Sequence, residues 1–382
     1  MEQRAWVATR KGLFETRRRN GAWAIERVSF LGEPVSMMLP PQPSGRMFAA
    51  LNLSHFGVKL HASDDAGVNW HELPAPAYPP QPEGEPAGGV AWKLVQIWSL
   101  EAGSGAANGT LWAGTLPGGL FRSTDGGESW QLVESLWNQP GRAEWFGGGY
   151  DVPGIHSICP HPTRAAELLV GISCGGAWVS RDDGASWLLQ AQGMSAAYMP
   201  PGQAANPNIQ DPHRIVRSPA RPDVLWCQHH NGIWRSGDNA QSWQEVTAAP
   251  LSSFGFAVAV HPEHADTAWF VPGVADQQRV PVDAALVVNR TRDGGRSFET
   301  LRSGLPSENC YDLVYRHGLT MGASGHRLMM GSTTGGLWAS DDGGDRWAAV
   351  AARACRRSTP CASGRPAVLR DCCLHCGEQR TT

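Results

Sequence analysis

The chain has 382 residues and a formal net charge of −3, and its composition is marked by 45 glycines and 17 tryptophans. The small net charge argues against a nucleic-acid-binding surface or a polybasic membrane contact, and no apolar run approaches the ~20 residues of a membrane span. A hydrophobic content of 41% with so many glycines is typical of short strands joined by tight turns.

The first predicted element is a strand over residues 5–9, and the hairpin after it carries the first copy of a phrase that recurs along the chain. The phrase, Ser/Thr-x-Asp-x-Gly-x-x-Trp/Phe, is clearest at 123–130 (STDGGESW). The copy at 16–23 has lost its acid, and the copy at 236–243 has Ala240 in place of the glycine. The seven copies begin at Thr16, Ser63, Ser123, Ser180, Ser236, Thr291 and Ser340. A period of roughly 50–60 residues predicts a repeat architecture.

The phrase has the chemistry of a hairpin tip. Its Ser and Asp side chains can hydrogen-bond nearby backbone groups and hold a compact turn, and its glycine supplies the positive φ that such turns need. The closing aromatic residue starts the next strand with a large apolar face. Because each repeat carries its own acid, we interpret these acids as structural rather than catalytic.

Each repeat contains the same strand-like pieces. Apolar stretches such as 155–159, 110–115 and 119–122 represent the first, second and third strand of a repeat, and the fourth strand starts at the aromatic residue of the box. Four antiparallel strands repeated seven times predict an all-β fold, a single seven-bladed β-propeller over residues 1–350. A β-sandwich would not repeat one hairpin signature in every unit.

The two ends of the chain bear on how the ring closes. The chain opens on the second strand of a repeat, so the first blade is expected to lack its innermost strand unless the other end supplies it. No apolar strand follows Trp347; residues 351–382 instead hold five of the nine cysteines and six arginines. We expect this tail to be irregular and disordered. Its cluster at 372–376 (CCLHC) fits the paired zinc spacings poorly, and we assign it no function.

The remaining cysteines indicate a compartment. Up to residue 350 there are four, each in a different repeat, and the N-terminal MEQRAWVATRKG has no hydrophobic core of the secretory kind. Reduced, packed thiols in a cytoplasmic protein are therefore expected.

On these boxes the chain resembles the BNR/Asp-box repeat propellers of the sialidase-like superfamily, in particular bacterial proteins described as glycosyl hydrolase or exo-sialidase-like. The resemblance covers residues 1–350 and implies the fold. It implies an activity only weakly, because the repeat occurs in sialidases, xyloglucan hydrolases, sorting receptors and photosystem assembly factors alike.

True sialidase chemistry is not expected. The sialidase pattern needs a Phe/Tyr-Arg-Ile-Pro segment near the start, an arginine trio and a Tyr–Glu nucleophile pair on six blades. Here 213–216 (HRIV) is only a partial match in the wrong place. The xyloglucan hydrolases pair two propellers around a cleft, whereas this chain holds one.

Strand order predicts where a site would form. With alternating strand directions, the box-bearing tips lie on one face, and the second-to-third-strand turns and the connections between blades lie on the other. That second face receives the long segments 71–92, 131–155, 188–212 and 273–284. Long loops gathered on one rim are where a propeller would build a pocket.

The candidate site residues are polar or aromatic side chains expected on that face. His156 and His213 occupy equivalent places at the start of innermost strands. The candidate general acids or bases are Asp151, Asp211 and Glu144. The candidate ligand-binding residues are His55, Tyr150, His156, His213, His229, His230 and Arg279.

Three interpretations stay open at this point. The polar residues could be hydrogen-bonded structural groups of the propeller mouth. They could instead form a pocket for a glycan or another small polar ligand, with or without hydrolysis. His156, His213 and His229 could also hold a divalent metal, with His55 as a further candidate. A non-enzymatic scaffold with a protein partner is the alternative to an enzyme.

We hypothesise that the tail after residue 350 is a frameshift product. Residues 354–364 (ACRRSTPCASG) can be written in codons that, read two bases on, encode LPPIYAVRFG, a turn followed by an apolar strand. The nucleotide sequence of the gene is expected to contain such codons. A different choice of codons in that window, encoding no such strand, would remove the hypothesis.

Overall fold

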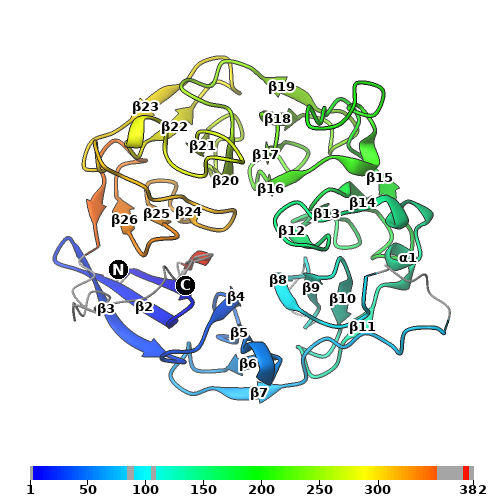
Figure 1. Cartoon of the computed structure of the whole chain (residues 1–382). Coiled ribbons are helices and arrows are strands. Elements are labelled where there is room, and N and C mark those ends of the chain that lie inside the picture. The colour runs from blue at the N-terminus through cyan, green and yellow to red at the C-terminus, as the bar shows by residue number, and fades with distance from the viewer. Residues whose placement is uncertain (1–2, 84–89, 105–108, 351–372, 378–382) are drawn as a thin grey trace, which may run out of the picture.

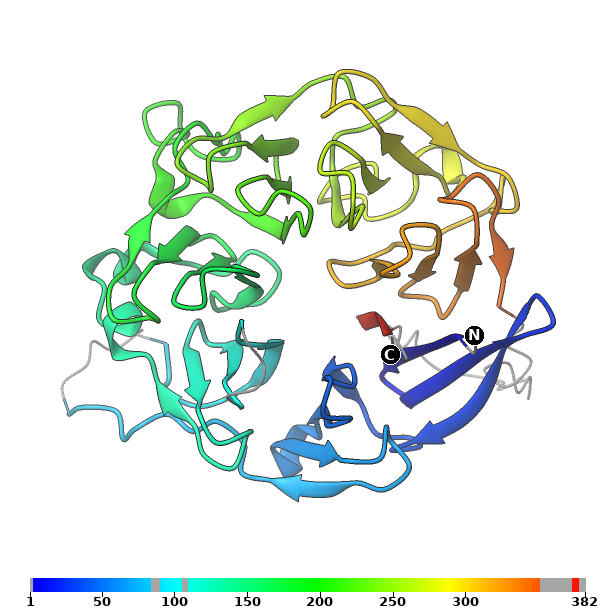
Figure 2. The same cartoon turned by 180° about the vertical axis from the view of Figure 1, so that it is seen from behind.

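Seven four-stranded antiparallel sheets surround a common axis in the computed structural model, which describes residues 3–83, 90–104, 109–350 and 373–377 (Figures 1 and 2). Blade 1 comprises β1 (Gln3–Thr9), β2 (Gly12–Arg19), β3 (Ala22–Ser29) and β28 (Cys373–Gly377). Blade 2 comprises β4 (Val35–Leu39), β5 (Met47–Asn52), β6 (Val58–Ser63) and β7 (His71–Leu73). Blade 3 comprises β8 (Gln96–Ala102), β9 (Leu111–Leu116), β10 (Leu120–Ser123) and β11 (Gln131–Leu132). Blade 4 comprises β12 (Ile155–Pro160), β13 (Leu168–Ile172), β14 (Gly176–Ser180) and β15 (Leu188–Leu189).

Blade 5 comprises β16 (Pro212–Arg217), β17 (Leu225–His229), β18 (Ile233–Ser236) and β19 (Gln244–Val246). Blade 6 comprises β20 (Gly255–Val260), β21 (Ala268–Pro272), β22 (Val288–Thr291) and β23 (Glu299–Leu301). Blade 7 comprises β24 (Leu319–Met321), β25 (Leu328–Gly331), β26 (Leu337–Ser340) and β27 (Ala348–Ala349). The predicted seven-bladed propeller is confirmed. The connections of the described chain contain short helical segments, α1 (Glu134–Trp137), η1 (Ser54–Phe56), η3 (Pro140–Glu144), η4 (Pro207–Ile209) and η5 (Val282–Ala284). None of these is long and apolar enough to cross a membrane.

The first blade has its fourth strand. β28 pairs antiparallel with β1, with Arg4 opposite Gly377 and Ala8 opposite Cys373, and it lies at the inner edge of the blade (Figures 1 and 2). The position expected to be empty is therefore filled from the other end of the chain. The tail was expected to be disordered over 351–382, but residues 373–377 form β28. Residues 351–372 and 378–382 lie outside the described part of the chain. The frameshift hypothesis stays a prediction about the gene.

The Asp boxes form the hairpin tips that their chemistry predicts. In the box at 123–130 the Ser123 hydroxyl accepts a hydrogen bond from the Gly127 N–H at 2.8 Å and donates one to Asp125 at 2.8 Å. Asp125 in turn accepts the Ser129 N–H at 3.0 Å. The same bond from backbone N–H to hydroxyl recurs in the other five boxes that keep their acid.

These hydrogen bonds also change how the box acids titrate. Bonds from the Ser129 side chain and backbone lower the pKa of Asp125 to about 2, and bonds from Asn69 do the same for Asp65. Because both values lie below the ordinary value near 3.9, the carboxylates favour the folded state above about pH 4. That contribution is lost as the pH falls toward 2.

The innermost strands of blades 2 to 6 share an irregularity. Their pairing with the second strand shifts by one residue at Ser36 in β4, Trp98 in β8, His156 in β12 and His213 in β16. Such a bulge bends the strand and re-aims the side chain of the extra residue. The equivalent irregularity in β20 includes Phe256. Residues at one repeat position are thereby turned toward neighbouring blades.

Blade-to-blade packing is apolar. Between blades 3 and 4 the indoles of Trp112 and Trp178 join one buried cluster with Leu120 and Val170. The four cysteines that precede residue 350, Cys159, Cys174, Cys227 and Cys310, are free and buried, as expected for packed thiols.

We predict that Ser123→Ala lowers the free energy of unfolding by about 1–3 kcal/mol. The serine is buried, and its loss leaves the Gly127 N–H without its acceptor. Urea denaturation followed by tryptophan fluorescence measures the change. Thr124→Ala in the same box is the control, because Thr124 is exposed, and it should stay within about 0.5 kcal/mol of the parent. Equal losses in both variants would contradict the assignment.

Candidate functional site

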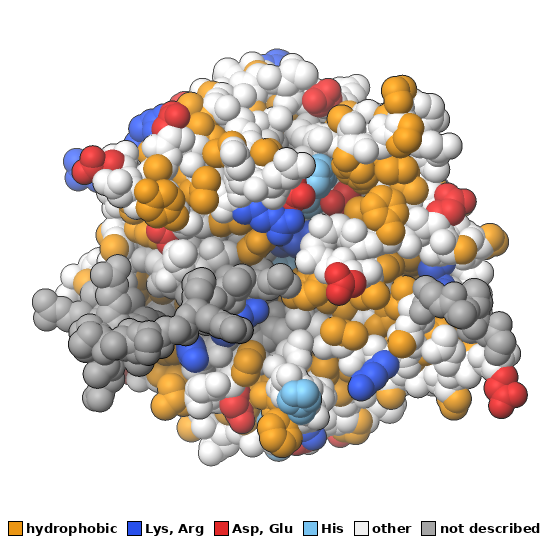
Figure 3. Space-filling model, viewed as in Figure 1, with side chains coloured by type: hydrophobic (Ala, Val, Ile, Leu, Met, Phe, Trp, Pro, Cys, Tyr) orange, Lys and Arg blue, Asp and Glu red, His pale blue; other side chains and the backbone are white. Residues whose placement is uncertain are grey.

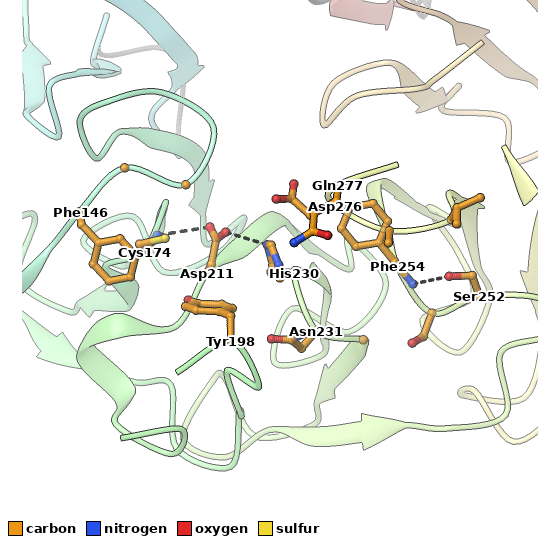
Figure 4. Close-up of a pocket in the computed structure, with 16 residues that line it drawn as sticks. Phe146, Cys174, Tyr198, Asp211, His230, Asn231, Ser252, Phe254, Asp276 and Gln277 are labelled. Atoms are coloured by element: carbon orange, nitrogen blue, oxygen red, sulfur yellow. Dashed lines mark hydrogen bonds and ion pairs between the residues drawn. The ribbon is translucent and has the colours of Figure 1, made fainter. Parts of the chain in front are cut away.

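A pocket of about 570 Å³ lies among blades 4, 5 and 6 on the face opposite the Asp boxes (Figure 4). All of its walls come from connections between blades or from turns between second and third strands, as the strand order predicts. The long segments 131–155, 188–212 and 273–284 each contribute. The lining residues are Phe146, Gly147, Gly148, Cys174, Tyr198, Asp211, His230, Asn231, Gly232, Ser252, Ser253, Phe254, Val274, Ala275, Asp276 and Gln277.

Aromatic rings form one wall of the pocket. The side chains of Phe146 and Tyr198 remain 37% and 38% exposed, and their rings meet edge to face at 6.4 Å. The Tyr198 hydroxyl donates to the Ile209 carbonyl at 2.8 Å, which fixes the ring in place. In Figure 4, Phe146 and Tyr198 lie on one side of His230 and Phe254 lies on the other; Phe254 is almost fully buried. The pocket therefore offers flat apolar surfaces held by specific contacts.

The polar floor is organised around Asp211. Its Oδ1 accepts the Cys174 N–H at 3.2 Å, and its Oδ2 lies 3.5 Å from His213 Nε2 and 3.4 Å from His230 Nδ1. Burial alone would raise the pKa of Asp211, but the contacts with both imidazoles and the nearby Arg316 charge outweigh it and hold the pKa well below its ordinary value. The floor thus contains a buried, ionised carboxylate.

His213 is held in one tautomer. Its Nδ1 lies 2.6 Å from the carbonyl oxygen of Gly255, and because a carbonyl only accepts, Nδ1 carries the proton. The ring stacks on Phe256 at 4.3 Å between centroids, and burial lowers its pKa. The other ring nitrogen, Nε2, faces the Asp211 carboxylate.

A layer of rings at the inner edge of the blades surrounds this floor. Trp98 meets His156 at 5.5 Å edge to face, and the guanidinium of Arg316 lies 4.7 Å from the Trp98 ring and 5.5 Å from the Phe256 ring. Basic, acidic and histidine side chains gather near the centre of the ring in Figure 3. The bulged residues of blades 3 and 4 thus contact each other, those of blades 5 and 6 do the same, and Arg316 lies against one ring of each pair.

Sequence and structure comparisons agree with the fold. The profile of the BNR/Asp-box repeat family matches residues 121–132. The protein is a seven-bladed propeller with BNR/Asp-box repeats. A search of curated proteins finds no match to this chain.

Solved structures with the same architecture include an ancestral GH74 enzyme, with a TM-score of 0.57 and 15% identity over 80% of this propeller and 36% of that chain. YCF48 bound to D1 peptide gives a TM-score of 0.54 and 14% identity over 89% and 90% of the two chains. YCF48 from Cyanidioschyzon merolae gives 0.52 and 12% over 83% and 84%. The propeller spans about a third of the GH74 enzyme, and at these identities the similarity shows the fold alone.

Of the predicted histidines, the structure brings His213 and His230 together with Asp211 but leaves two others apart. Both ring nitrogens of His229 face backbone N–H groups, of Asp211 at 3.0 Å and of Asn231 at 2.9 Å, and burial lowers its pKa to about 3. His156 contacts the Ser157 hydroxyl through Nδ1 at 2.9 Å. Within the part of the chain that the structure describes, the side chains whose ligand atoms lie close enough together to hold a metal are Asp211, His213 and His230, whereas the predicted set was His156, His213 and His229.

The predicted acids other than Asp211 are outside the pocket lining. Glu144 is exposed at the end of η3, where it accepts a hydrogen bond from the Asn208 amide at 3.1 Å. That amide also bonds the Gly141 carbonyl at 2.8 Å, so the contact ties two loops together. Asp151 is exposed in the connection that leads to β12.

The other predicted ligand-binding residues do not line the pocket. His55 is exposed in η1 of blade 2. The Tyr150 hydroxyl donates to Gln96 at 3.4 Å, and its ring meets Trp98 at 5.2 Å. Arg279 pairs with Asp276 at 2.5 Å and donates to the Tyr315 hydroxyl at 3.2 Å. Arg279 therefore positions a lining acid instead of facing the pocket itself.

The sequence interpretation missed several lining residues, above all Tyr198, Phe254 and Asn231. All three lie in the connections or turns that were assigned to this rim. The strand order therefore predicts the rim on which these three residues lie. Because they have no equivalent in the other repeats, the sequence does not indicate that their side chains point into the pocket.

A half-buried acid on the innermost strand of blade 3 gives a pH-dependent prediction. Burial raises the pKa of Glu101 in β8 to about 7, against the opposing charge of Arg214. Because the folded-state value lies above the ordinary one, ionisation of Glu101 destabilises the propeller as the pH rises from about 4 to above 7.

We expect Glu101→Gln to be more stable than the parent at pH 8 by about 1–2 kcal/mol. The expected difference is small because the Glu101 side chain keeps some exposure to solvent. The difference should shrink toward zero at pH 4.5, where the parent carboxyl is protonated. Urea denaturation at both pH values measures it. A variant that is less stable than the parent at pH 8 would show that Arg214 needs the ionised carboxylate.

Proposed function

We propose that the propeller binds a glycan, or a similar small polar ligand rich in hydroxyl groups, in the pocket among blades 4, 5 and 6. The observation that carries the proposal is the pairing of exposed, rigidly held rings with hydrogen-bonding groups in one concavity. A volume of about 570 Å³ is within the range of small-molecule sites.

The lining has the two kinds of surface that a sugar requires. The C–H face of a sugar ring packs on an aromatic face, which Phe146 and Tyr198 provide. Its hydroxyl groups need both donors and acceptors, which the side chains of Asn231, Ser252 and Gln277 supply. Rings fixed by contacts such as that of Tyr198 with Ile209 lose little conformational entropy on binding.

The carboxylates support binding more than hydrolysis. Glycoside hydrolysis ordinarily needs two carboxyl groups that flank the scissile bond. The acids in the lining are Asp211, which is engaged by Cys174, His213 and His230, and Asp276, which is paired with Arg279. A pair with one protonated acid and one free base is not formed by these two side chains. A glycosyl-hydrolase-like binding propeller is the function that we propose.

A peptide is the second candidate ligand. YCF48, solved with a bound D1 peptide, matches this propeller over nearly the whole length of both chains, whereas the GH74 enzyme is much longer. The exposed Phe146 and Tyr198 would serve a peptide side chain as well as a sugar. In that case the propeller would be a scaffold with a protein partner.

We predict that Tyr198→Ala weakens binding of a sugar about tenfold, the loss of roughly 1.4 kcal/mol of ring contact. Ligand-observed NMR with a panel of mono- and disaccharides identifies the sugar, and calorimetry gives the affinity. Tyr198→Phe keeps the ring and should bind within about threefold of the parent. Tyr311→Ala is the matched control, because Tyr311 is 62% exposed and outside the lining.

Two outcomes would contradict the glycan proposal. The first is the absence of binding by every sugar of the panel to the parent protein. The second is sugar binding that Tyr198→Ala and Tyr311→Ala change equally. Specific capture of a peptide that Tyr198→Ala abolishes would select the scaffold function.

A further inference from the structure

The spacing of the three polar side chains at the pocket floor distinguishes a metal site from a hydrogen-bonded triad. Charged N–H···O bonds are about 2.7–2.9 Å long, so separations of 3.5 Å and 3.4 Å from Asp211 Oδ2 to His213 Nε2 and His230 Nδ1 are too long for good hydrogen bonds. Two ligands of a tetrahedral metal with bonds of about 2.1 Å lie about 3.4 Å apart. All three ligand atoms are within 4.8 Å of one another.

The donor atoms are already prepared for a cation. The Gly255 carbonyl lies against Nδ1 of His213, which leaves Nε2 as the ring nitrogen that faces the carboxylate. The Cys174 N–H donates to Asp211 Oδ1, whereas Oδ2 faces the two imidazoles. In metal sites the ligating imidazole ordinarily donates its other N–H to a carbonyl, and the carboxylate is itself hydrogen-bonded.

A neighbouring serine adds an independent indication. The Ser173 hydroxyl is buried and has no hydrogen-bond partner among the described residues. It and Asp211 Oδ2 each lie 2.8 Å from the point that a Cβ on residue 148 would occupy, so only glycine at position 148 lets the backbone lie against this part of the pocket. A water bound to the metal would satisfy the hydroxyl.

We propose that Asp211, His213 and His230 bind a first-row divalent cation, with Zn²⁺ as the best match to two imidazoles and one carboxylate. The site goes beyond the glycan proposal, since it rests on its own geometry. Asp211 and His213 are almost fully buried, whereas His230 is 18% exposed toward the pocket. Three protein ligands leave at least one coordination position open.

The open position has a consequence for ligand choice. A cation at the pocket floor would accept an oxygen of a bound ligand, which favours a vicinal diol or a carboxylate over an apolar group. The aromatic wall of Phe146 and Tyr198 would then hold the rest of the molecule.

The test uses the full-length protein after treatment with EDTA. Titration with ZnCl₂ by calorimetry, and with CoCl₂ by visible absorption, should show one equivalent bound at this site. His230→Gln and Asp211→Asn should each weaken that binding by at least about 100-fold, because loss of a ligand exceeds the 10–100-fold cost of losing an outer partner. Melting curves without metal establish that both variants are folded.

Two controls separate this site from weaker ones. His71→Gln removes an exposed histidine on β7 and should leave the affinity unchanged. Cobalt bound by cysteines gives intense thiolate charge-transfer bands, which the Asp211 site should lack. The proposal is overturned if the parent binds no metal, if the folded variants bind as well as the parent, or if thiolate bands account for all of the cobalt.

The metal and glycan proposals can fail separately. Zinc binding that depends on His230, with no sugar bound in the presence of zinc, would support the metal site and contradict the glycan proposal. Sugar binding that survives EDTA and depends on Tyr198, with no zinc bound, would do the reverse.

Discussion

The geometry of the site depends on a single irregularity of the inner strands. In blades 2 to 5 the pairing with the second strand slips by one residue at the same place, and the extra residue is turned out of the regular alternation. At the inner edge of the propeller, side chains at these bulges contact side chains of the neighbouring blade. Trp98 meets His156, and His213 stacks on Phe256. Without the bulge, His213 would lie on the other face of β16 and the cluster with Asp211 would not form.

Burial makes that cluster specific. An ionised carboxylate out of contact with water is costly unless charges or hydrogen bonds surround it. Asp211 is supported by a backbone N–H, by two imidazoles and by the nearby charge of Arg316. These partners come from blades 4, 5 and 7, so the floor of the pocket also links blades that the apolar clusters join elsewhere. The same contacts that stabilise the carboxylate hold its Oδ2 against the two imidazoles.

The repeats provide the scaffold and the connections provide the site. Every box that keeps its acid makes the same local hydrogen bonds, and those bonds face away from the pocket. A GH74 enzyme and YCF48 share this architecture at 15% identity or less, so the architecture by itself is compatible with different ligands. What is particular to this chain is the set of loop residues around Tyr198 and Asp211.

The sequence by itself determined the blade number, the role of the boxes and the rim on which loops gather, because a box is held by hydrogen bonds within eight residues and its period counts the blades. It also drew attention to Asp211, His213 and His230. Only the tertiary structure decided which polar groups meet. His229 and His230 are adjacent, yet one faces backbone N–H groups and the other faces Asp211. Successive side chains point to opposite sides of a strand, and a one-residue bulge reverses that phase, which no local pattern of residues reveals.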